Sequence, residues 1–317
     1  MSLSTPVAFI IFNRPDTTER VFEAIRQAKP LKLLVIADGP RLDRSDEVKK
    51  CTATRAIIDR VDWDCEVLIN YSDINLGCKR RVSSGIDWVF SQVEEAIILE
   101  DDCLPAPSFF QFCQTMVERY RDDDRIMMIS GNNFRPEDNR VKDSYYFSKY
   151  ASIWGWATWQ RAWQHYDVNM SSWPEFRDRG LINAVCHEPV EAEYWLKILN
   201  DVAENLIDTW DYQWVYTCWQ QSGMSIMPTV NLISNIGFRD DATHTFDKSP
   251  WAEMKVGNIY DIVHPTFILN DRDADIYMFE HLFGGEALKF DRTIYGKVIQ
   301  LARNLKRVSK KLNISTI

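Results

Sequence analysis

The sequence predicts an α/β fold in which a mainly parallel central sheet carries helices on both of its faces. Three observations support this prediction. Short apolar runs recur through the first third of the chain, and such runs are typical of strands covered on both sides. Segments with a helical pattern lie between these runs. The connections are short, which favours repeated β-α-β units and therefore parallel strands.

The first two strands are predicted at residues 7–12 and 33–37, which are both continuous apolar runs. Between them, Asp16 and Glu19 have the spacing of a capping box, which predicts the start of a helix. One face of this helix is apolar and is expected to pack on the sheet. That face carries Val21, Phe22, Ile25 and Ala28.

The alternation of helix and strand continues as far as an acidic triplet, Glu100-Asp101-Asp102. We expect a polar helix at about residues 45–61, a strand at 65–69, a helix at about 79–93 and a strand at 96–99. This fourth strand runs directly into the triplet.

The second half of the chain has a more mixed pattern. Trp-rich stretches at about 153–166 and 191–221 predict helices, and residues 224–233 predict a strand. Residues 237–257 are polar and predict a loop. Neither an internal repeat nor a low-complexity linker interrupts the chain.

The bulk composition excludes several classes of protein. The net charge of −9 argues against a general nucleic-acid binder, which needs a basic surface. The seven cysteines contain no CxxC pair, so neither a disulfide framework nor a zinc knuckle is expected. The sequence has neither a long apolar span nor a signal-like start, which predicts a cytoplasmic protein.

Nine of the twelve tryptophans lie between positions 154 and 219. Large aromatic side chains gathered in this way can line a carbohydrate site, because the faces of sugars stack on rings. They can also fill a core, since each buries a large area. For any single one of these tryptophans, burial statistics favour the core.

Three groups of polar residues follow predicted strands. Asn13 and Arg14 follow the first strand, Asp38 follows the second, and the triplet follows the fourth. In open parallel sheets the ligand site lies beyond the carboxyl ends of the strands. We therefore expect these groups to converge on one site.

The triplet itself poses an electrostatic problem, because three adjacent carboxylates repel one another and are costly to bury unpaired. A divalent cation resolves the conflict, and carboxylate oxygens suit Mn²⁺ or Mg²⁺. In an extended chain, Glu100 and Asp102 would point to one side and Asp101 to the other. A bare Glu-Asp-Asp can also be a solvated acidic turn.

Wider sequence context relates the triplet to a known family. Residues 97–105, 109–110 and 125–131, the turn 153–156 and the pair Trp210-Asp211 together resemble the GT-A glycosyltransferases. Among these the chain is most similar to the alpha-1,3-mannosyl-glycoprotein N-acetylglucosaminyltransferase I group and its bacterial relatives. The resemblance covers roughly residues 5–245, and the triplet and Trp-Asp are its specific parts.

The resemblance implies a role for each acid at the strand ends. Asp102 is expected to coordinate the metal that bridges the diphosphate, and Asp101 to bind the ribose. Glu100 would support the sugar or the water shell of the metal. Asp38 matches the acid that reads the base, where a carboxylate would accept the uracil N3–H.

Other residues are assigned to the donor less specifically. Asn13 and Arg14 lie where the family packs the nucleotide, and Trp156 lies in the matched turn, where a donor contact is expected. Lys79 and Arg80, with the adjacent Arg81, could meet the diphosphate. The alternative for this basic run is a solvated helix start.

Asp211 is the candidate general base. Inverting sugar transfer needs a carboxylate that takes the proton of the acceptor hydroxyl on the side of the sugar opposite the leaving group. The family has a second acid where this chain has Tyr212. The structural alternative is an Asp that caps the helix at 211–221.

His244 in the late polar loop is a candidate metal ligand, and a solvated histidine is the alternative. The loop that carries it, residues 237–257, could order over the donor as a lid.

The resemblance therefore implies inverting transfer from a UDP-sugar, UDP-N-acetylglucosamine or a similar hexose, to a glycan or lipid-linked acceptor, as in bacterial surface polysaccharide synthesis. One alternative is a sugar-nucleotide-forming nucleotidyltransferase. That class has a glycine-rich loop after its first strand, whereas residues 13–16 here contain no glycine. The other alternative is a non-catalytic carbohydrate-binding protein.

The expected catalytic domain spans residues 4–285, with a nucleotide-binding half at 4–130 and an acceptor-binding half at 131–285. A basic amphipathic helix is expected in the C-terminal part, 286–317, with its pattern clearest at 293–312. Such a helix is typical of peripheral contact with the inner face of a membrane, or of packing on its own domain or on a second copy.

Overall fold

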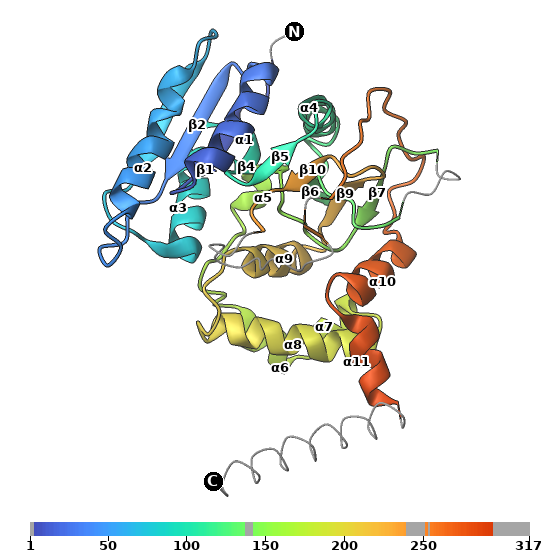
Figure 1. Ribbon diagram of the computed structural model, residues 1–317. Coiled ribbons are helices and arrows are strands. Elements are labelled where there is room, and N and C mark those ends of the chain that lie inside the picture. The colour runs from blue at the N-terminus through green and yellow to red at the C-terminus, as the bar shows by residue number, and fades with distance from the viewer. Residues whose placement is uncertain (1–2, 137–141, 239–250, 253, 294–317) are drawn as a thin grey trace, which may run out of the picture.

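The computed structural model describes residues 3–136, 142–238, 251–252 and 254–293. In these residues, eight strands form one sheet in the order β3-β2-β1-β4-β8-β6-β9-β7, and two short strands, β5 and β10, form an antiparallel pair (Figure 1). The strands of the large sheet are β1 (Val7–Ile11), β2 (Lys32–Ala37), β3 (Glu66–Tyr71), β4 (Glu95–Glu100), β6 (Ile126–Ser130), β7 (Tyr145–Ser148), β8 (Trp156–Trp159) and β9 (Met224–Pro228); the pair is β5 (Cys103–Pro105) and β10 (Ile233–Asn235).

The large sheet is mainly parallel, as predicted. β3, β2, β1 and β4 run parallel to one another, and β6 runs parallel to β9. β8 lies antiparallel to both β4 and β6, and β7 lies antiparallel to β9. In the register, Ile10 lies opposite Glu100 and Ile11 opposite Ala37, so β1, β2 and β4 end at the same edge of the sheet.

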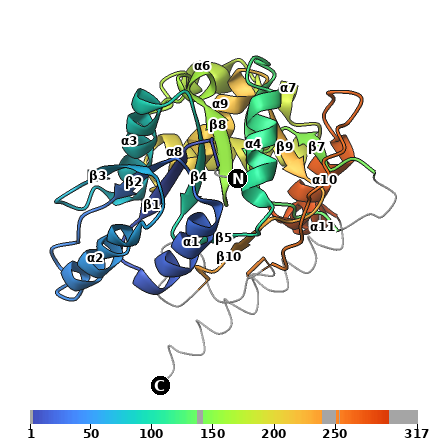
Figure 2. The same cartoon turned by 90° about the horizontal axis from the view of Figure 1, so that it is seen from above.

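Helices cover both faces of the sheet. Figure 2 shows α3 on one side of β1 and β2, and α1 and α2 on the other. The helices are α1 (Pro15–Ala28), α2 (Glu47–Ala56), α3 (Gly77–Gln92), α4 (Phe109–Arg119), α5 (Gln160–Trp163), α6 (Trp173–Asp178), α7 (Ile182–Val185), α8 (Pro189–Ala203), α9 (Asp211–Gln220), α10 (Arg272–His281) and α11 (Gly285–Arg292), with one 3₁₀ turn at Ile58–Arg60.

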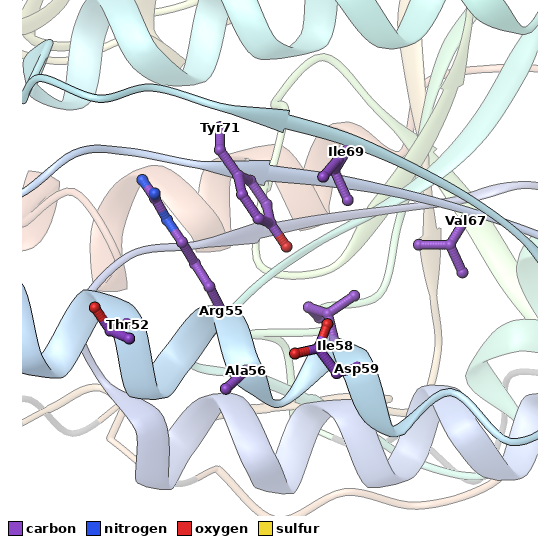
Figure 3. Close-up of a pocket in the computed structure, with 8 residues that line it drawn as sticks. All are labelled: Thr52, Arg55, Ala56, Ile58, Asp59, Val67, Ile69 and Tyr71. Carbon is purple, nitrogen blue, oxygen red and sulfur yellow. The ribbon is translucent and has the colours of Figure 1, made fainter.

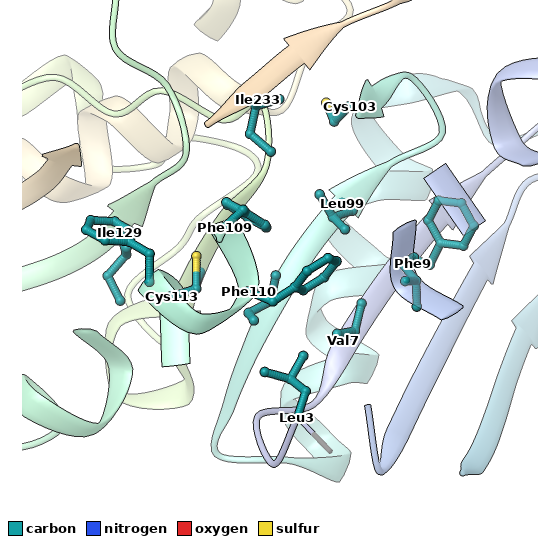
Figure 4. Packing of buried hydrophobic residues seen from close by; sticks show 14 of the residues in the cluster. Leu3, Val7, Phe9, Leu99, Cys103, Phe109, Phe110, Cys113, Ile129 and Ile233 are labelled. Carbon is teal, nitrogen blue, oxygen red and sulfur yellow. The ribbon is translucent and has the colours of Figure 1, made fainter. Parts of the chain in front are cut away.

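Two apolar cores result from this layering. On one face, Phe9 and Leu99 of the sheet pack with Phe109 and Phe110 of α4 (Figure 4). On the other face, Ile98 and its neighbours pack with apolar side chains of α3, α5 and α9. Successive residues of β4 therefore face opposite cores, as the pleat of a strand requires.

The predicted helix at 153–166 is wrong. The structure places the strand β8 at Trp156–Trp159 and only a short helix, α5, after it. All four residues of β8 are buried, and a short apolar run buried on both faces cannot be told from a buried helix by its pattern. Gly155, at φ 63°, adopts the left-handed conformation that separates this strand from the preceding turn.

Two further boundaries differ from the prediction. Residues 224–233 do not form one strand, because β9 ends at Pro228 and β10, which begins at Ile233, pairs with β5 in the small sheet. The first helix begins at Pro15, one residue before Asp16, and its N-terminus has no side-chain cap. Proline at the first helical position supplies the start instead of the capping box, since its fixed φ suits a helix.

Eight of the nine clustered tryptophans are buried, which confirms the core interpretation for these eight. Only Trp154 is half-buried. The buried eight are Trp156, Trp159, Trp163, Trp173, Trp195, Trp210, Trp214 and Trp219.

A third core joins the outer layer, in which α8 packs on α9 (Figure 1), to the sheet. Within it, the Glu191 carboxylate of α8 accepts hydrogen bonds from Lys149 Nζ at 2.6 Å and from the Tyr150 hydroxyl. The Asp275 carboxylate of α10 accepts one from the Ser148 hydroxyl at 2.5 Å. These buried polar contacts fix α8 and α10 against the end of β7.

The described part of the expected C-terminal segment is α11, which packs on α8 and α10. Residues 294–317, and most of the amphipathic pattern at 293–312, lie outside the described residues, so the membrane contact and the domain boundary at 286 stay predictions. Among the helices of the described residues, none has the length and apolar character needed to cross a bilayer.

Asp275→Asn should flatten the pH dependence of stability. Burial raises the pKa of Asp275 from 3.8 to about 7, against the opposing bonds from Ser148 and Lys149. The native state therefore holds a proton between these values that the unfolded chain has lost, so stability falls as pH rises through this window. Urea denaturation from pH 5 to 8 should show a smaller fall for Asp275→Asn than for the wild type. The exposed Asp273→Asn is the control, and identical profiles for Asp275→Asn and the wild type would contradict the assignment.

Candidate functional site

The acidic triplet straddles the end of a strand and a turn. β4 ends at Glu100, and Asp101-Asp102 form the turn that leads into β5. Arg14 Nη1 lies 2.8 Å from Asp102 Oδ2 and 3.9 Å from Asp101 Oδ1. Asp101 and Asp102 thus face the same guanidinium group. The predicted alternation, with Asp101 on the opposite side, is wrong because the chain turns after Glu100.

Asp101 is buried and held by the end of β1. Its Oδ2 accepts a hydrogen bond from the Phe12 backbone N–H at 3.1 Å. Burial raises the pKa of Asp101 to about 7, although the positive charge of Arg14 opposes the shift. Burial thus favours the neutral form of this carboxyl group, and Arg14 favours the charged form.

Glu100 has the same parity in β4 as Ile98 and so belongs to the face covered by α3 and α9. Burial raises the pKa of Glu100 to about 8, and repulsion from Asp102, Asp101 and Asp211 adds to the shift. The contribution of Asp211 is informative, because that residue is distant in sequence. It shows that the predicted base lies within electrostatic range of the triplet.

Asp211 is the first residue of α9. Its Oδ1 accepts hydrogen bonds from the Thr209 hydroxyl and, at 3.0 Å, from the backbone N–H of Tyr212. The side chain is half-buried. A carboxylate in the first turn is also favoured by the helix dipole, so the local geometry fits a helix-start role as well as a base.

Arg14 is the cation that balances the triplet. Burial would lower the pKa of its guanidinium group, but the charges of Asp101 and Asp102 outweigh that effect and raise it. The side chain is 20% exposed. Pro15 starts α1 immediately afterwards, so the residue is fixed between the end of β1 and the first turn of a helix.

Gly237 closes the site from the other half of the chain, a role that the sequence pattern did not reveal. A Cβ atom here would lie 2.2 Å from Asp102 Oδ2 and 2.9 Å from Arg14 Nη1. The approach is fixed by β10, where Asn235 pairs with Cys103, and by the Ile236 N–H, which donates to the Asp102 carbonyl oxygen at 2.8 Å. In the sequence, the one feature that could have drawn attention to Gly237 is its position shortly after the apolar residues that form β10.

Asp38 anchors the start of α3. Its carboxylate accepts hydrogen bonds from the backbone N–H groups of Gly39, Leu76 and Gly77 at 2.9–3.2 Å, and from the Asn75 amide at 3.0 Å. Burial raises the pKa of Asp38, and the backbone N–H groups oppose that shift. The residue thus joins the end of β2 to the loop before α3.

Asn13 connects the end of β1 to the loop after β2. Its amide donates to Glu47 Oε1 at 2.9 Å, and the backbone N–H of Arg41 donates to Glu47 Oε2 at 2.6 Å. The Arg41 guanidinium group lies over the Phe12 ring, 5.4 Å from its centroid. A planar cationic and aromatic surface is thus built beside Asn13.

The three residues of the predicted basic run at the start of α3 have different surroundings. Lys79 Nζ donates to Asn205 Oδ1 at 2.8 Å, and Arg80 is exposed. Arg81 is buried and donates to Asn70 Oδ1 at 2.8 Å. Arg81 is therefore committed to the end of β3, whereas Lys79 and Arg80 stay at the surface.

Of the two remaining candidates, only Trp156 lies among the described residues, and it does not line the site. Trp156 is 0% exposed and packs among Trp163, Trp210 and Trp214, so the structure places it in the core rather than on a donor surface. His244 lies outside the described residues.

A separate hollow of about 530 Å³ lies between α2 and the edge strand β3 (Figure 3). Arg55 and Tyr71 form part of its wall, with the guanidinium group 4.8 Å from the ring centroid. Arg55 also donates to the carbonyl oxygens of Asp38 and Ser72. No candidate residue from the strand ends lines this hollow.

The carboxylates of the described residues do not form a closed metal cage. No group of three or more His, Cys, Asp and Glu side chains has metal-binding spacing in this part of the chain. Asp102 instead offers a carboxylate whose charge is already balanced by Arg14.

Comparisons with known proteins identify no family for the chain. No protein-family profile matches it, and no curated protein matches it. Among solved structures, UDP-glucose pyrophosphorylase in complex with UDP-glucose is similar over 51% of this chain and 78% of its own, with 8% identity and a TM-score of 0.30. A likeness at this TM-score supports no argument about function.

Arg14→Met should destabilise the protein. The substitution leaves the partly buried triplet without its cation; breaking a fully buried ion pair from one side costs about 3 kcal/mol, and the loss here should be smaller because Arg14 and Asp102 are partly exposed. Urea denaturation at pH 7 measures the loss. Arg14→Lys keeps the charge and should lose less, whereas equal stability of Arg14→Met and the wild type would show that the ion pair does not balance the site.

Proposed function

We propose that the chain transfers a sugar from a nucleotide-diphosphate donor to an acceptor hydroxyl, with inversion at the anomeric carbon, as a GT-A glycosyltransferase. The observation that carries the proposal is the position of Asp211. A carboxylate from the distant helix α9 lies within electrostatic range of Glu100, at the edge of the sheet where β1 and β4 end. Inverting transfer needs a base for the acceptor hydroxyl, and a metal-dependent enzyme also needs acids that hold the ion.

The donor would lie across the strand ends. Arg14 is placed to meet the diphosphate, and Asp101 the ribose. The Phe12 ring and the Arg41 guanidinium group form a surface that is both aromatic and cationic, and a planar base could stack on it. Asp38 would shape this part of the site through the loop that it holds.

A divalent ion fits the acids in one specific way. Mg²⁺ and similar ions are commonly held by one or two carboxylates together with the phosphates of the substrate, not by a full protein cage. Asp102 would hold such an ion. The positive charge of the ion would offset the repulsion between carboxylates that, together with burial, raises the pKa of Glu100. When bound, the ion would offset negative charge on the departing diphosphate.

Asp211 would take the proton of the acceptor hydroxyl. Thr209 and the start of α9 hold Oδ1, which fixes the orientation of the carboxylate. A base held in this way lowers the barrier by accepting the proton as the oxygen attacks. UDP-N-acetylglucosamine or a similar UDP-hexose is the proposed donor, and a glycan or lipid-linked glycan the acceptor.

The alternatives are separated by their products. A nucleotidyltransferase would release pyrophosphate from UTP and a sugar 1-phosphate. The direct passage from β1 through residues 12–14 into α1, without a glycine-rich phosphate loop, argues against that class. A carbohydrate-binding protein would bind sugars in EDTA without any nucleotide, and the burial of eight clustered tryptophans removes its main support.

UDP with Mn²⁺ should raise the melting temperature, because a ligand at about 100-fold its Kd stabilises the native state by about 2.7 kcal/mol. Asp102→Asn should abolish the part of the rise that depends on the metal. The control is Asp124→Asn, whose side chain is 96% exposed. The absence of any UDP-dependent shift with Mn²⁺, Mg²⁺ or Ca²⁺ would rule out the proposal.

Asp211→Asn should slow sugar transfer about 100-fold or more, since general-base catalysis contributes on the order of 10²–10⁴. The shift in melting temperature with UDP and Mn²⁺ should stay, because Asn keeps the hydrogen bonds at the start of α9. Release of UDP from a panel of UDP-sugars measures the rate. An Asp211→Asn protein as active as the wild type would show that another group is the base.

A further inference from the structure

A second pocket, of about 360 Å³, lies in the half of the chain that follows β4. This volume is within the range of small-molecule sites in proteins. The side chains on which the inference depends are Phe134, Arg135, Trp251, Lys255 and Tyr277. None of the candidate residues at the strand ends lines this pocket.

One wall of the pocket is aromatic. The Trp251 ring meets the Phe134 ring edge-on, with 5.3 Å between centroids and an angle of 90°. Trp251 and Tyr277 are half-buried, so each keeps part of its surface accessible. Unlike the buried tryptophans of the core, these rings offer apolar area on which the face of a pyranose can pack.

The lining is also positively charged. Arg135 and Lys255 contribute cations, and among the described residues that line the pocket no side chain is acidic, although the whole chain has a net charge of −9. Arg135 Nη1 is paired with Asp271 at 2.7 Å, which holds the guanidinium group in place, and its side chain stays 26% exposed. Lys255 is exposed. A local basic lining in an acidic protein favours an anionic ligand.

The frame of the pocket is preformed. The Asn231 amide donates to the carbonyl oxygens of Ile233 and Lys255, at 2.7 and 3.3 Å, and its Oδ1 accepts from the Asn133 backbone N–H at 3.2 Å. These bonds join the segment after β6 to residues 254–255. A wall that is ordered before binding reduces the entropic cost of association.

A continuous run of rings connects this pocket with Asp102. Phe238 follows Gly237, which abuts Asp102. From Phe238 the run continues through Trp154 and Phe134 to Trp251, with centroid distances of 5.6, 5.5 and 5.3 Å. The pocket does not include Asp102 in its lining and is connected to it through these rings.

We propose that this pocket binds a sugar unit of the acceptor that carries an anionic group, a carboxylate or a phosphate, away from the reacting hydroxyl. The acceptor role rests on the proposed function, whereas sugar binding by the pocket does not. The aromatic wall takes the face of the pyranose, and Lys255 with Arg135 takes the anion. Binding of a remote unit of this kind orients the acceptor for transfer.

Calorimetry on the full chain with methyl glucuronide, glucose 1-phosphate and neutral methyl glucoside tests the proposal and separates the two sources of negative charge. At least one anionic sugar should bind about fivefold more tightly than the neutral one. Lys255→Gln should remove that preference, and Trp251→Leu should weaken binding about tenfold. Lys49→Gln and Phe267→Leu, at exposed residues elsewhere, should change nothing.

The stabilisation by UDP with Mn²⁺ serves as the second readout and as a check that the variants fold. It should be unchanged in Lys255→Gln and Trp251→Leu. Equal binding of all three sugars, the absence of binding, or binding that both pocket variants leave intact would overturn the proposal. Sugar binding that depends on Lys255 in a protein that does not bind UDP would overturn the acceptor role alone.

Discussion

The ion pair between Arg14 and Asp102 is the contact on which the candidate site depends. Three carboxylates gather where β4 ends, and burial already raises the pKa of Glu100 and Asp101. Arg14 supplies the cation that lets this end of the sheet fold with its acids in place. The pairing of β1 with β4 sets Ile10 opposite Glu100, and Arg14, at the junction of β1 and α1, therefore lies beside the triplet. In the proposed function, the anionic donor binds next to this ion pair.

The site draws on both halves of the chain. The strand ends supply Arg14 and the triplet, α9 supplies Asp211, and β10 brings Gly237 against Asp102. The Gly237 position explains why a larger side chain would disturb the site, since a Cβ atom would collide with the carboxylate. The aromatic run that starts at Phe238 then leads away from Asp102 to the basic pocket. If the two proposals hold, the donor side and the acceptor side are connected through one short segment, residues 237–238.

The parts of the fold that could be predicted were those with a single interpretation in the sequence. β1, β2 and β4 are continuous apolar runs between helices, and a parallel sheet buried on both faces produces that pattern. Trp156–Trp159 could not be assigned correctly, because a buried strand and a buried helix are equally apolar. Asp101 and Asp102 were predicted to point to opposite sides, and they converge on Arg14 because β4 ends at Glu100 and the chain turns there. The pairing of these two carboxylates with Arg14 depends on the turn at residues 101–102, and the sequence pattern does not reveal that turn. Gly237 shares this limit, since its importance arises from a contact with a residue far away in the chain.

The stereochemistry of the product tests the central claim most directly. In the proposed site, Asp211 activates the attacking oxygen from the side opposite the diphosphate, so an α-linked UDP-sugar must give a β-configured product. Proton NMR of the anomeric signal, recorded while the enzyme hydrolyses or transfers from such a donor with Mn²⁺, reads this configuration before the free sugar equilibrates. The β anomer appearing first, together with UDP, is the predicted result. An α anomer appearing first would contradict inverting transfer with Asp211 as the base.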